Sequence, residues 1–402
     1  MLRHTPTALL CALVLWAGPA RAYRVNEHVE VWGYFQSWVT LHEEMNFAPD
    51  PRPDQFPSGD EGADSTTGFS LNRARIGTRL SVLEGMLGVD FHLKLEDGVE
   101  VLDLLLRVTP VQGLTLMLGQ FRIPGAYENQ IPNSELDFIL RTDTSVALVD
   151  YSLSRTTYTS SLFYGNRAFL RDFGLGLQGD LGVIGVPLRG FLMVGNGLGA
   201  NLFIGGDTKQ QFVVTNKGQF FYGVRLEVDA AADVLTLGAH FNYNKHDDVV
   251  FKSKRAVYDL HRISYSADAT LRAPGTGLRM VWMYGAGSIL DDFDDNGKTD
   301  FIYSGREGRL IWRLNPLLRL LGADTDVLER HLLELGFRWE RYSTESDESG
   351  LLVRRDNWTV GLSYRWQPYI RMQFNVILHR VDEPYPPDLD YDVYLLCVQF
   401  AG

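Results

Sequence analysis

The last third of the chain alternates apolar and polar residues one for one. Between Trp358 and Trp366 every second residue is apolar, and the intervening residues are threonine, glycine, serine and arginine. The alternation returns over Ile370–Leu378, with Ile377 as an exception, and again over Tyr391–Phe400. Successive side chains of a β-strand point to opposite faces, so each of these segments has one apolar face and one polar face.

The two faces differ in a way that restricts the fold further. The polar face carries arginine, whereas the apolar face is long and is bordered by Trp and Tyr. A strand with hydrocarbon on one side and water on the other has this composition, and strands cross a bilayer only in closed barrels. We therefore predict an all-β fold, a transmembrane antiparallel β-barrel.

The connections between the predicted strands support a barrel. Sixteen segments between residues 28 and 400 have strand character, and short turns such as 83–85, 230–233 and 367–368 tend to alternate with long loops such as 42–67 and 123–168. Other predicted long loops are 197–216, 245–258, 288–301 and 343–353. Two connections break the alternation: 97–99 is short where a long loop is expected, and 315–329 is long where a short turn is expected.

Short turns at one rim and long loops at the other, with an even strand number, are typical of bacterial outer-membrane barrels. We predict about sixteen strands, short periplasmic turns and long extracellular loops. Because Val146–Tyr151 has strand character, residues 145–165 could instead form an extra hairpin, and an eighteen-stranded barrel is the alternative.

The N-terminal 22 residues have the features of a cleaved signal peptide. Arg3 and His4 precede an apolar run from Ala8 to Ala17, which is followed by Ala20-Arg21-Ala22, an Ala-x-Ala cleavage site. The run is too short to span a bilayer comfortably. We therefore predict a signal peptide over residues 1–22, export of the chain, and a single barrel over residues 23–402.

Charge and cysteine content exclude some classes of protein. The net charge is −12, and removal of the two arginines of the signal peptide brings it to −14, which disfavours nucleic acid as a partner. Cys11 leaves with the signal peptide, so Cys397 has no partner for an intramolecular disulfide. We interpret Cys397 as a small residue of the last strand.

Many cations share the polar faces of the predicted strands. A cationic side chain facing lipid at the bilayer midplane costs roughly 2–4 kcal/mol, so these residues are expected to face the lumen. Most of them are expected to be neutralised by acids, and any surplus would attract anions. The predicted pore-lining cations are Arg73, Arg75, Arg79, Lys94, Arg122, Arg141, Arg171, Arg225, Arg262, Arg279, Arg338, Arg365 and Arg371.

Three stretches, in order, resemble the phosphate-selective porin O and P family. They are Arg73-Ala74-Arg75-Ile76-Gly77, then Gly119–Pro124 with Glu128, Ser134 and Phe138–Arg141 downstream, and finally Arg171-Asp172-Phe173-Gly174. They cover about residues 69–181, and each motif alone is of low specificity. The resemblance implies sixteen strands, a homotrimer, and a third loop at about 123–168 folded into the lumen as a constriction. It places Pro124, Glu128, Ser134 and Phe138 in this constriction loop.

Outer-membrane barrels that resemble this chain carry an aromatic residue at or near the C-terminus, which the barrel assembly machinery reads. Phe400 is the candidate for this assembly signal, and its outward neighbours Tyr394, Leu396 and Val398 place it at the periplasmic rim.

The predicted loop departs from the family in the charges that would select phosphate. Phosphate selection is expected to need lysines, but residues 123–168 contain none; the cations there are Arg141, Arg155 and Arg167. We therefore expect an outer-membrane porin for passive diffusion of small polar or anionic solutes, with phosphate less favoured. Its expected partners are outer-membrane lipid, these solutes, the assembly machinery and two further copies of the chain.

Rival chemistry finds less support. The acidic stretch with Asp292, Asp294 and Asn296 resembles the first half of a calcium loop, but Tyr303 stands where a glutamate is required, so an exposed acidic turn is the preferred interpretation and no metal is assigned. His246-Asp247-Asp248 at a strand end lacks a matching catalytic partner. No nucleophile elbow, zinc spacing or phosphate-binding glycine loop is present. We predict no cofactor and no enzymatic activity, with a barrel enzyme or a secreted carbohydrate-binding β-protein as alternatives.

Overall fold

The computed structural model describes residues 23–42, 68–96, 99–149, 171–197, 212–214, 220–251, 256–291, 301–346, 352–366, 369–382 and 391–401. The predicted signal peptide, the calcium candidates Asp292, Asp294 and Asn296, and the loop cations Arg155 and Arg167 lie outside these residues.

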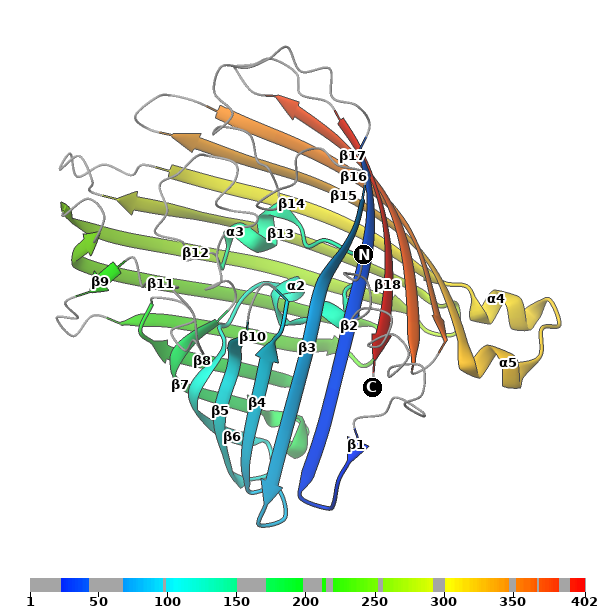
Figure 1. Ribbon diagram of the computed structural model, residues 1–402, viewed down its shortest axis with the longest axis horizontal. Coiled ribbons are helices and arrows are strands. Elements are labelled where there is room, and N and C mark those ends of the chain that lie inside the picture. Colours follow the sequence, from blue (N-terminus) through cyan, green and yellow to red (C-terminus); the bar gives the residue numbers. More distant parts are fainter. Residues whose placement is uncertain are drawn as a thin grey trace, which may run out of the picture.

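Sixteen strands within the described ranges form one closed antiparallel barrel (Figure 1). Each strand pairs with its neighbour in the chain, β8 pairs with β10, and the last strand, β18, pairs with β2 and closes the ring. The strands are β2 (Val29–His42), β3 (Gly68–Val82), β4 (Leu87–Lys94), β5 (Glu100–Val111), β6 (Leu114–Arg122), β7 (Arg171–Asp180), β8 (Leu188–Gly195), β10 (Phe221–Ala231), β11 (Leu235–Phe251), β12 (Ala256–Ala273), β13 (Leu278–Asp291), β14 (Phe301–Arg313), β15 (His331–Ser346), β16 (Leu352–Trp366), β17 (Ile370–Asp382) and β18 (Tyr391–Ala401).

The predicted fold class is confirmed, with sixteen strands in the ring. Two further short strands, β1 (Tyr23–Arg24) and β9 (Phe212–Val214), pair with β2 and β11 but lie outside the ring. The strand predicted from residue 146 is wrong in its described part, because Val146 and Ala147 belong to the short helix α3 (Asp143–Ala147). The rest of the proposed extra hairpin lies outside the described residues.

Two connections differ from the prediction. Most of the predicted loop 245–258 is strand, since β11 continues to Phe251 and β12 begins at Ala256. The long connection 315–329 folds into two helices, α4 (Asn315–Leu320) and α5 (Thr325–Arg330), which extend past the strand ends (Figure 1). The Asn315 side chain donates hydrogen bonds to the carbonyl oxygens of Leu328 (2.7 Å) and His331 (2.6 Å) and so joins both ends of this pair.

The burial of side chains follows the sequence alternation. On β15, Leu335 and Phe337 are 42% and 40% exposed, whereas Arg338 and Glu340 are 2% and 1% exposed. The apolar side chains therefore form the outer face of the barrel and the polar side chains its inner face. In the described part of the chain, no helix has the length and apolar character needed to cross a membrane.

The residues after β6 fill part of the barrel interior. Residues 123–149, which we call the inner segment, form α2 (Tyr127–Gln130), a 3-10 turn (Asn133–Glu135) and α3 (Figure 1). Ile123, Leu136, Phe138 and Leu148 are at most 1% exposed. The inner segment therefore supplies a hydrophobic core inside a ring whose inner wall is largely polar.

Candidate pore constriction

The inner segment is bound to the inner wall from β10 round to β17. Wall side chains donate hydrogen bonds to backbone carbonyl groups that its short helices and turns leave unpaired. These bonds join Arg225 to Gly125 (3.0 Å), Asn242 to Pro124 (2.9 Å), Ser264 to Leu148 (2.8 Å), Arg338 to Leu140 (2.8 Å), and Arg371 to Ser134 (3.0 Å) and Leu136 (2.6 Å).

Glycines of the wall make room for the large side chains of the inner segment. A Cβ atom at Gly336 or Gly361 would lie 2.9–3.1 Å from the Phe138 ring or from the Asn375 side chain. Phe138 therefore packs directly on the backbone of β15 and β16, and the guanidinium carbon of Arg338 lies 4.8 Å from its ring centroid. The predicted loop residue Phe138 is thus an anchor that faces the wall.

A second anchor is apolar. Ile139 of the inner segment packs with Trp38, Ile377, Leu395 and Cys397, which are all at most 6% exposed. Ile377, the exception in the sequence alternation, lies on the inner face of β17. An apolar residue is favourable there because it packs on the inner segment. Cys397 likewise is a buried packing residue and a free thiol.

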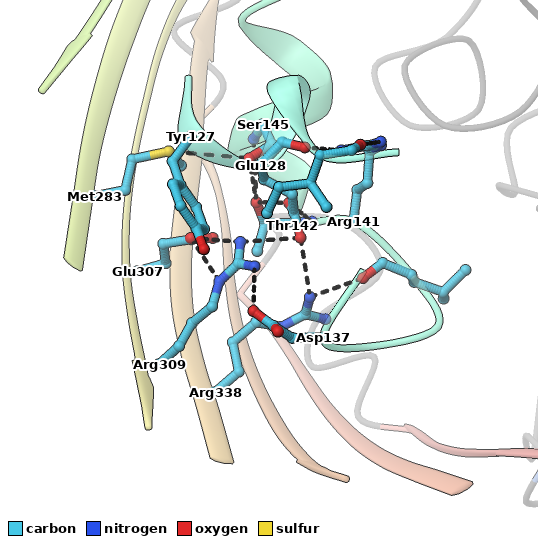
Figure 2. Close-up of polar contacts among 12 residues, drawn as sticks. Tyr127, Glu128, Asp137, Arg141, Thr142, Ser145, Met283, Glu307, Arg309 and Arg338 are labelled. Carbon is cyan, nitrogen blue, oxygen red and sulfur yellow. Dashed lines mark hydrogen bonds and ion pairs between the residues drawn. The ribbon is translucent and has the colours of Figure 1, made fainter. Parts of the chain in front are cut away.

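The third anchor is a cluster of buried charges around Glu128 (Figure 2). The Glu128 carboxylate lies 2.9 Å from Arg309 and 3.8 Å from Arg338, and it accepts hydrogen bonds from the backbone N–H (2.8 Å) and hydroxyl (2.9 Å) of Thr142. Burial alone would raise the pKa of Glu128, but Arg309, Arg338 and Arg141 outweigh it and lower the pKa to about 2. Glu128 is therefore ionised and ties α2 to β14 and β15.

Glu340 of β15 holds the other helix of the inner segment. Its carboxylate accepts hydrogen bonds from the Thr144 backbone N–H (2.8 Å) and hydroxyl (3.0 Å), in the first turn of α3. A carboxylate is favourable there because the first N–H groups of a helix have no partner within the helix. Asn357 also donates to Glu340 and to Asp143, at 3.3 Å each, so β16 takes part in the same contact.

Four predicted pore-lining cations on the opposite part of the wall, from β3 to β7, are paired with acids. Arg75 contacts Glu96, Arg79 contacts Asp90 at 2.8 Å, Lys94 lies 3.9 Å from Glu100, and Arg171 contacts Asp103 at 2.8 Å. Their charges are therefore largely neutralised within the wall.

Three further predicted cations have uncharged partners. Arg73 donates to the Gln36 side chain (2.8 Å) and lies over the Trp38 ring, Arg122 donates to the Gln130 carbonyl (3.2 Å), and Arg141 donates to the Ile131 carbonyl and the Asn133 side chain (2.7 Å each). None of the three forms an ion pair with an acid among the described residues. We call them the arginine triad; Arg73 comes from the wall, Arg141 from the inner segment, and Arg122 from the end of β6 where the segment begins.

The members of the triad lie close enough to interact. Burial lowers the pKa of Arg141 to about 9; Glu128 opposes this shift, while repulsion from Arg122 and Arg73 adds to it. Arg141 remains cationic at neutral pH. The triad is thus a concentration of positive charge between the inner segment and the β2–β3 wall.

The remaining predicted cations lie elsewhere on the inner wall. Arg225 also pairs with Asp268 (2.8 Å), and Arg279 contacts Asp137 and the Tyr127 hydroxyl (3.2 Å). Arg262 is buried and has partners, and Arg365 lies opposite Arg371 across β16 and β17. Since Arg225, Arg279, Arg338 and Arg371 all contact the inner segment, they form the wall behind it.

Sequence reasoning missed the residues that hold the inner segment most firmly. The side chain of Arg309 is fully buried and contacts Glu307 at 2.6 Å and Glu128 at 2.9 Å; it was predicted to face inward but is not among the predicted pore-lining cations. The alternation on β14 does place Glu307 and Arg309 inward, but nothing in the local sequence shows that a residue some 180 positions earlier, Glu128, lies over them.

The candidate assembly residue Phe400 lies on the outer face near the end of β18. Its ring stacks on Phe35 of β2, with 5.2 Å between centroids and an angle of 10° between the planes. Phe400 therefore contacts the seam where the last strand meets the first strand of the ring, and its role as an assembly signal stays a prediction.

A closed sixteen-stranded barrel with an apolar outer face and a segment bound inside it is the fold of outer-membrane porins. Solved structures with this fold include the anion-selective porin from Comamonas acidovorans, with a TM-score of 0.59 and 11% identity over 93% of this chain and 99% of that chain. OmpT, an outer membrane protein of Vibrio cholerae, has a TM-score of 0.58 and 9% identity over 95% and 100% of the two chains. The outer membrane channel DcaP of Acinetobacter baumannii has a TM-score of 0.53 and 9% identity over 96% of this chain and 100% of that chain.

At these identities the likeness shows the fold alone. No family model matches the chain, and no curated protein matches it either. The resemblance to the phosphate-selective porin family is therefore supported only at the level of the porin fold.

The prediction that the chain has no enzymatic activity needs correction. Similar structures include the outer membrane protein OmpT of Vibrio cholerae, and because likeness at 9% identity shows the fold alone, the shared fold does not exclude catalysis. Absence of familiar motifs was too little evidence for that exclusion, because catalytic groups on a barrel come from separate strands and loops and leave no contiguous motif.

Proposed function

We propose that this protein is an outer-membrane porin for passive diffusion of small polar solutes, with a preference for anions. The observation that carries the proposal is the arginine triad, in which Arg73, Arg122 and Arg141 have uncharged partners beside the inner segment. The fold shared with an anion-selective porin and an outer membrane channel supports a channel in general.

The position of the triad accounts for an anion preference in an acidic protein. The inner segment is bound to β10–β17 and shares buried apolar clusters with Trp38 of β2 and with Leu105 and Met117 of β5 and β6. The proposed path for solutes therefore runs on the remaining side, past the triad and the β3–β4 wall. Charges at a narrow, poorly hydrated passage act more strongly than the same charges in bulk water. Three cations beside such a passage would outweigh the net charge of −14 expected for the exported chain as a whole.

The proposal includes a location and partners. The apolar outer face would contact outer-membrane lipid, with the α4–α5 rim in the periplasm, and the chain would assemble as a homotrimer. The solutes are small anions in general. Phosphate has no special support, because residues 123–168 contain no lysine.

Arg73 provides the sharpest test, because its described contacts are with Gln36 and Trp38 and not with the inner segment. One unit charge at ~4 Å in water is worth about 1 kcal/mol, so Arg73→Gln should lower the anion-to-cation permeability ratio about two- to fivefold. Reversal potentials under a salt gradient in planar bilayers measure this ratio. Arg73→Lys should keep it.

Arg79→Gln is the matched control. Arg79 lies on the same strand and the same face, but it is paired with Asp90 and its side chain is 48% exposed. Its replacement should change the permeability ratio much less. Equal effects of Arg73→Gln and Arg79→Gln, or none from either, would show that the triad does not set selectivity.

A further inference from the structure

The outer wall of the barrel contains an apolar trough of about 650 Å³ across β5, β6, β7, β8, β10 and β11. Its sides are outward-facing residues such as Leu116, Leu175, Leu192 and Tyr222. The lining residues are almost entirely aliphatic or aromatic, which distinguishes this surface from the inner wall.

Strand register shows the shape of the trough. One side is a continuous row of paired residues, in which each member lies opposite the next on the neighbouring strand: Val108, Leu116, Leu177, Leu192, Val224 and Phe241. The other side is the parallel row of Leu106, Leu118, Leu175, Val194 and Tyr222. The rows are two residues apart along each strand, about 6.8 Å, and the longer row crosses six strands, about 24 Å.

The floor between the rows is closed by close packing on the inner side. Met117, Gly176, Met193 and Gly223 form the intervening row. An inward Cβ atom at Gly176 would lie 2.9 Å from both Met117 and Phe121, and one at Gly223 would lie 2.6 Å from Phe221. The hydrophobic core inside the barrel thus lies directly beneath the backbone, and the trough does not open into the lumen.

We propose that this trough binds one acyl chain of a membrane phospholipid. The trough is continuous with the apolar outer face, which is surrounded by hydrocarbon if the membrane location proposed above is right. A narrow channel with hydrocarbon walls and no polar floor matches a single extended chain better than the side chains of a protein partner, which would bring polar backbone with them.

The direction of the trough also suits an acyl chain. The rows run across the strands, and strands of such barrels tilt by roughly 35–45° from the membrane normal. A chain in the trough therefore runs obliquely through the leaflet. The acyl chain is surrounded by hydrocarbon both in the trough and in the free bilayer, so the hydrophobic effect does not favour binding. Van der Waals packing supplies the binding energy, and a side chain that fills the trough should abolish binding.

The test compares lipid retention by the full chain and two variants with paired tryptophans. Leu177 and Leu192 are cross-strand partners on β7 and β8, in the middle of one side of the trough. Leu177→Trp with Leu192→Trp would therefore fill the trough with two indole rings. The control pair is Leu335→Trp with Leu362→Trp, an outward cross-strand pair on β15 and β16 whose members are 42% and 43% exposed. All three proteins are reconstituted with phosphatidylethanolamine, extracted in mild detergent and examined by native mass spectrometry.

The expected result is one retained phosphatidylethanolamine per chain in the wild type and the control, and loss of most of it in the trough variant. Equal retention by all three proteins, or none by the wild type, overturns the proposal. If the trough variant keeps lipid but loses subunits, the trough is a contact between copies of the chain and the acyl-chain site is wrong. A wild type that fails to enter liposomes would instead contradict the proposed membrane location.

Discussion

Replacement of Glu128 by glutamine should loosen the inner segment without changing its size. The change keeps an oxygen that can accept from Thr142 but removes the charge beside Arg309 and Arg338. Arg309 would keep Glu307 at 2.6 Å, whereas Arg338 would lose its one acidic partner among the described residues.

Two independent magnitudes agree on the size of this effect. The pKa of Glu128 falls from an ordinary 4.5 to about 2, which corresponds to about 3 kcal/mol of stabilisation at neutral pH. Removal of one partner from a buried ion pair costs roughly 3–5 kcal/mol in other proteins. A loss of about 3 kcal/mol raises the population of a detached segment roughly a hundredfold.

Single-channel recording and thermal unfolding in detergent measure the two consequences. Glu128→Gln should increase open-channel current noise, raise the mean conductance and lower the unfolding midpoint. Glu135→Gln is the control, since Glu135 is an exposed acid of the same segment. Currents and midpoints that are the same for wild type and both variants would refute the role assigned to the charge cluster.

Three other outcomes are expected. Leu237→Arg puts a cation on the outer face, where Leu237 is 43% exposed, and should cost roughly 2–4 kcal/mol of barrel stability. It should reduce the yield of heat-modifiable barrel in membranes, whereas Thr236→Arg, on the inner face, should be accepted. Equal yields of the two variants would contradict the assignment of Leu237 to lipid and Thr236 to the lumen. Phe400→Asp should leave unassembled chains in the periplasm while Phe400→Trp assembles, and normal surface exposure of the aspartate variant would show that Phe400 is no assembly signal. Because the folded-state pKa of Glu128 is depressed, its stabilisation is present above pH 4.5 and is lost as the pH falls through about 2. The wild-type unfolding midpoint should therefore have an acid-dependent component near pH 2 that Glu128→Gln lacks, and an identical acid dependence of both proteins would contradict the assigned pKa.

The ring of the barrel was predictable from the sequence because its signal is local. A period of two assigns each side chain to lipid or lumen within one strand, and it placed Leu335 outward and Arg338 inward without knowledge of the neighbouring strands. The ends of β11 and β12 were less predictable, since Lys245 and His246 resemble the start of a loop although they pair with His261 and Leu260 of β12.

The inner segment could not be worked out in the same way. Its apolar residues have no period, and each is buried by residues far away in the chain: Phe138 by Gly336 and Gly361, and Ile139 by Ile377. The sequence contained one indirect signal, the apolar Ile377 on an otherwise polar face. An inward apolar residue in a polar wall indicates that something apolar covers it, but it does not say what.

The measurement that tests the central claim most directly is the reversal potential of the purified wild-type protein in a planar bilayer under a potassium chloride gradient. The proposal predicts stable single-channel steps and a potential of the sign given by chloride as the more permeant ion. A cation preference would contradict the role of the arginine triad, and the absence of any conductance from correctly folded, reconstituted barrel would contradict a porin.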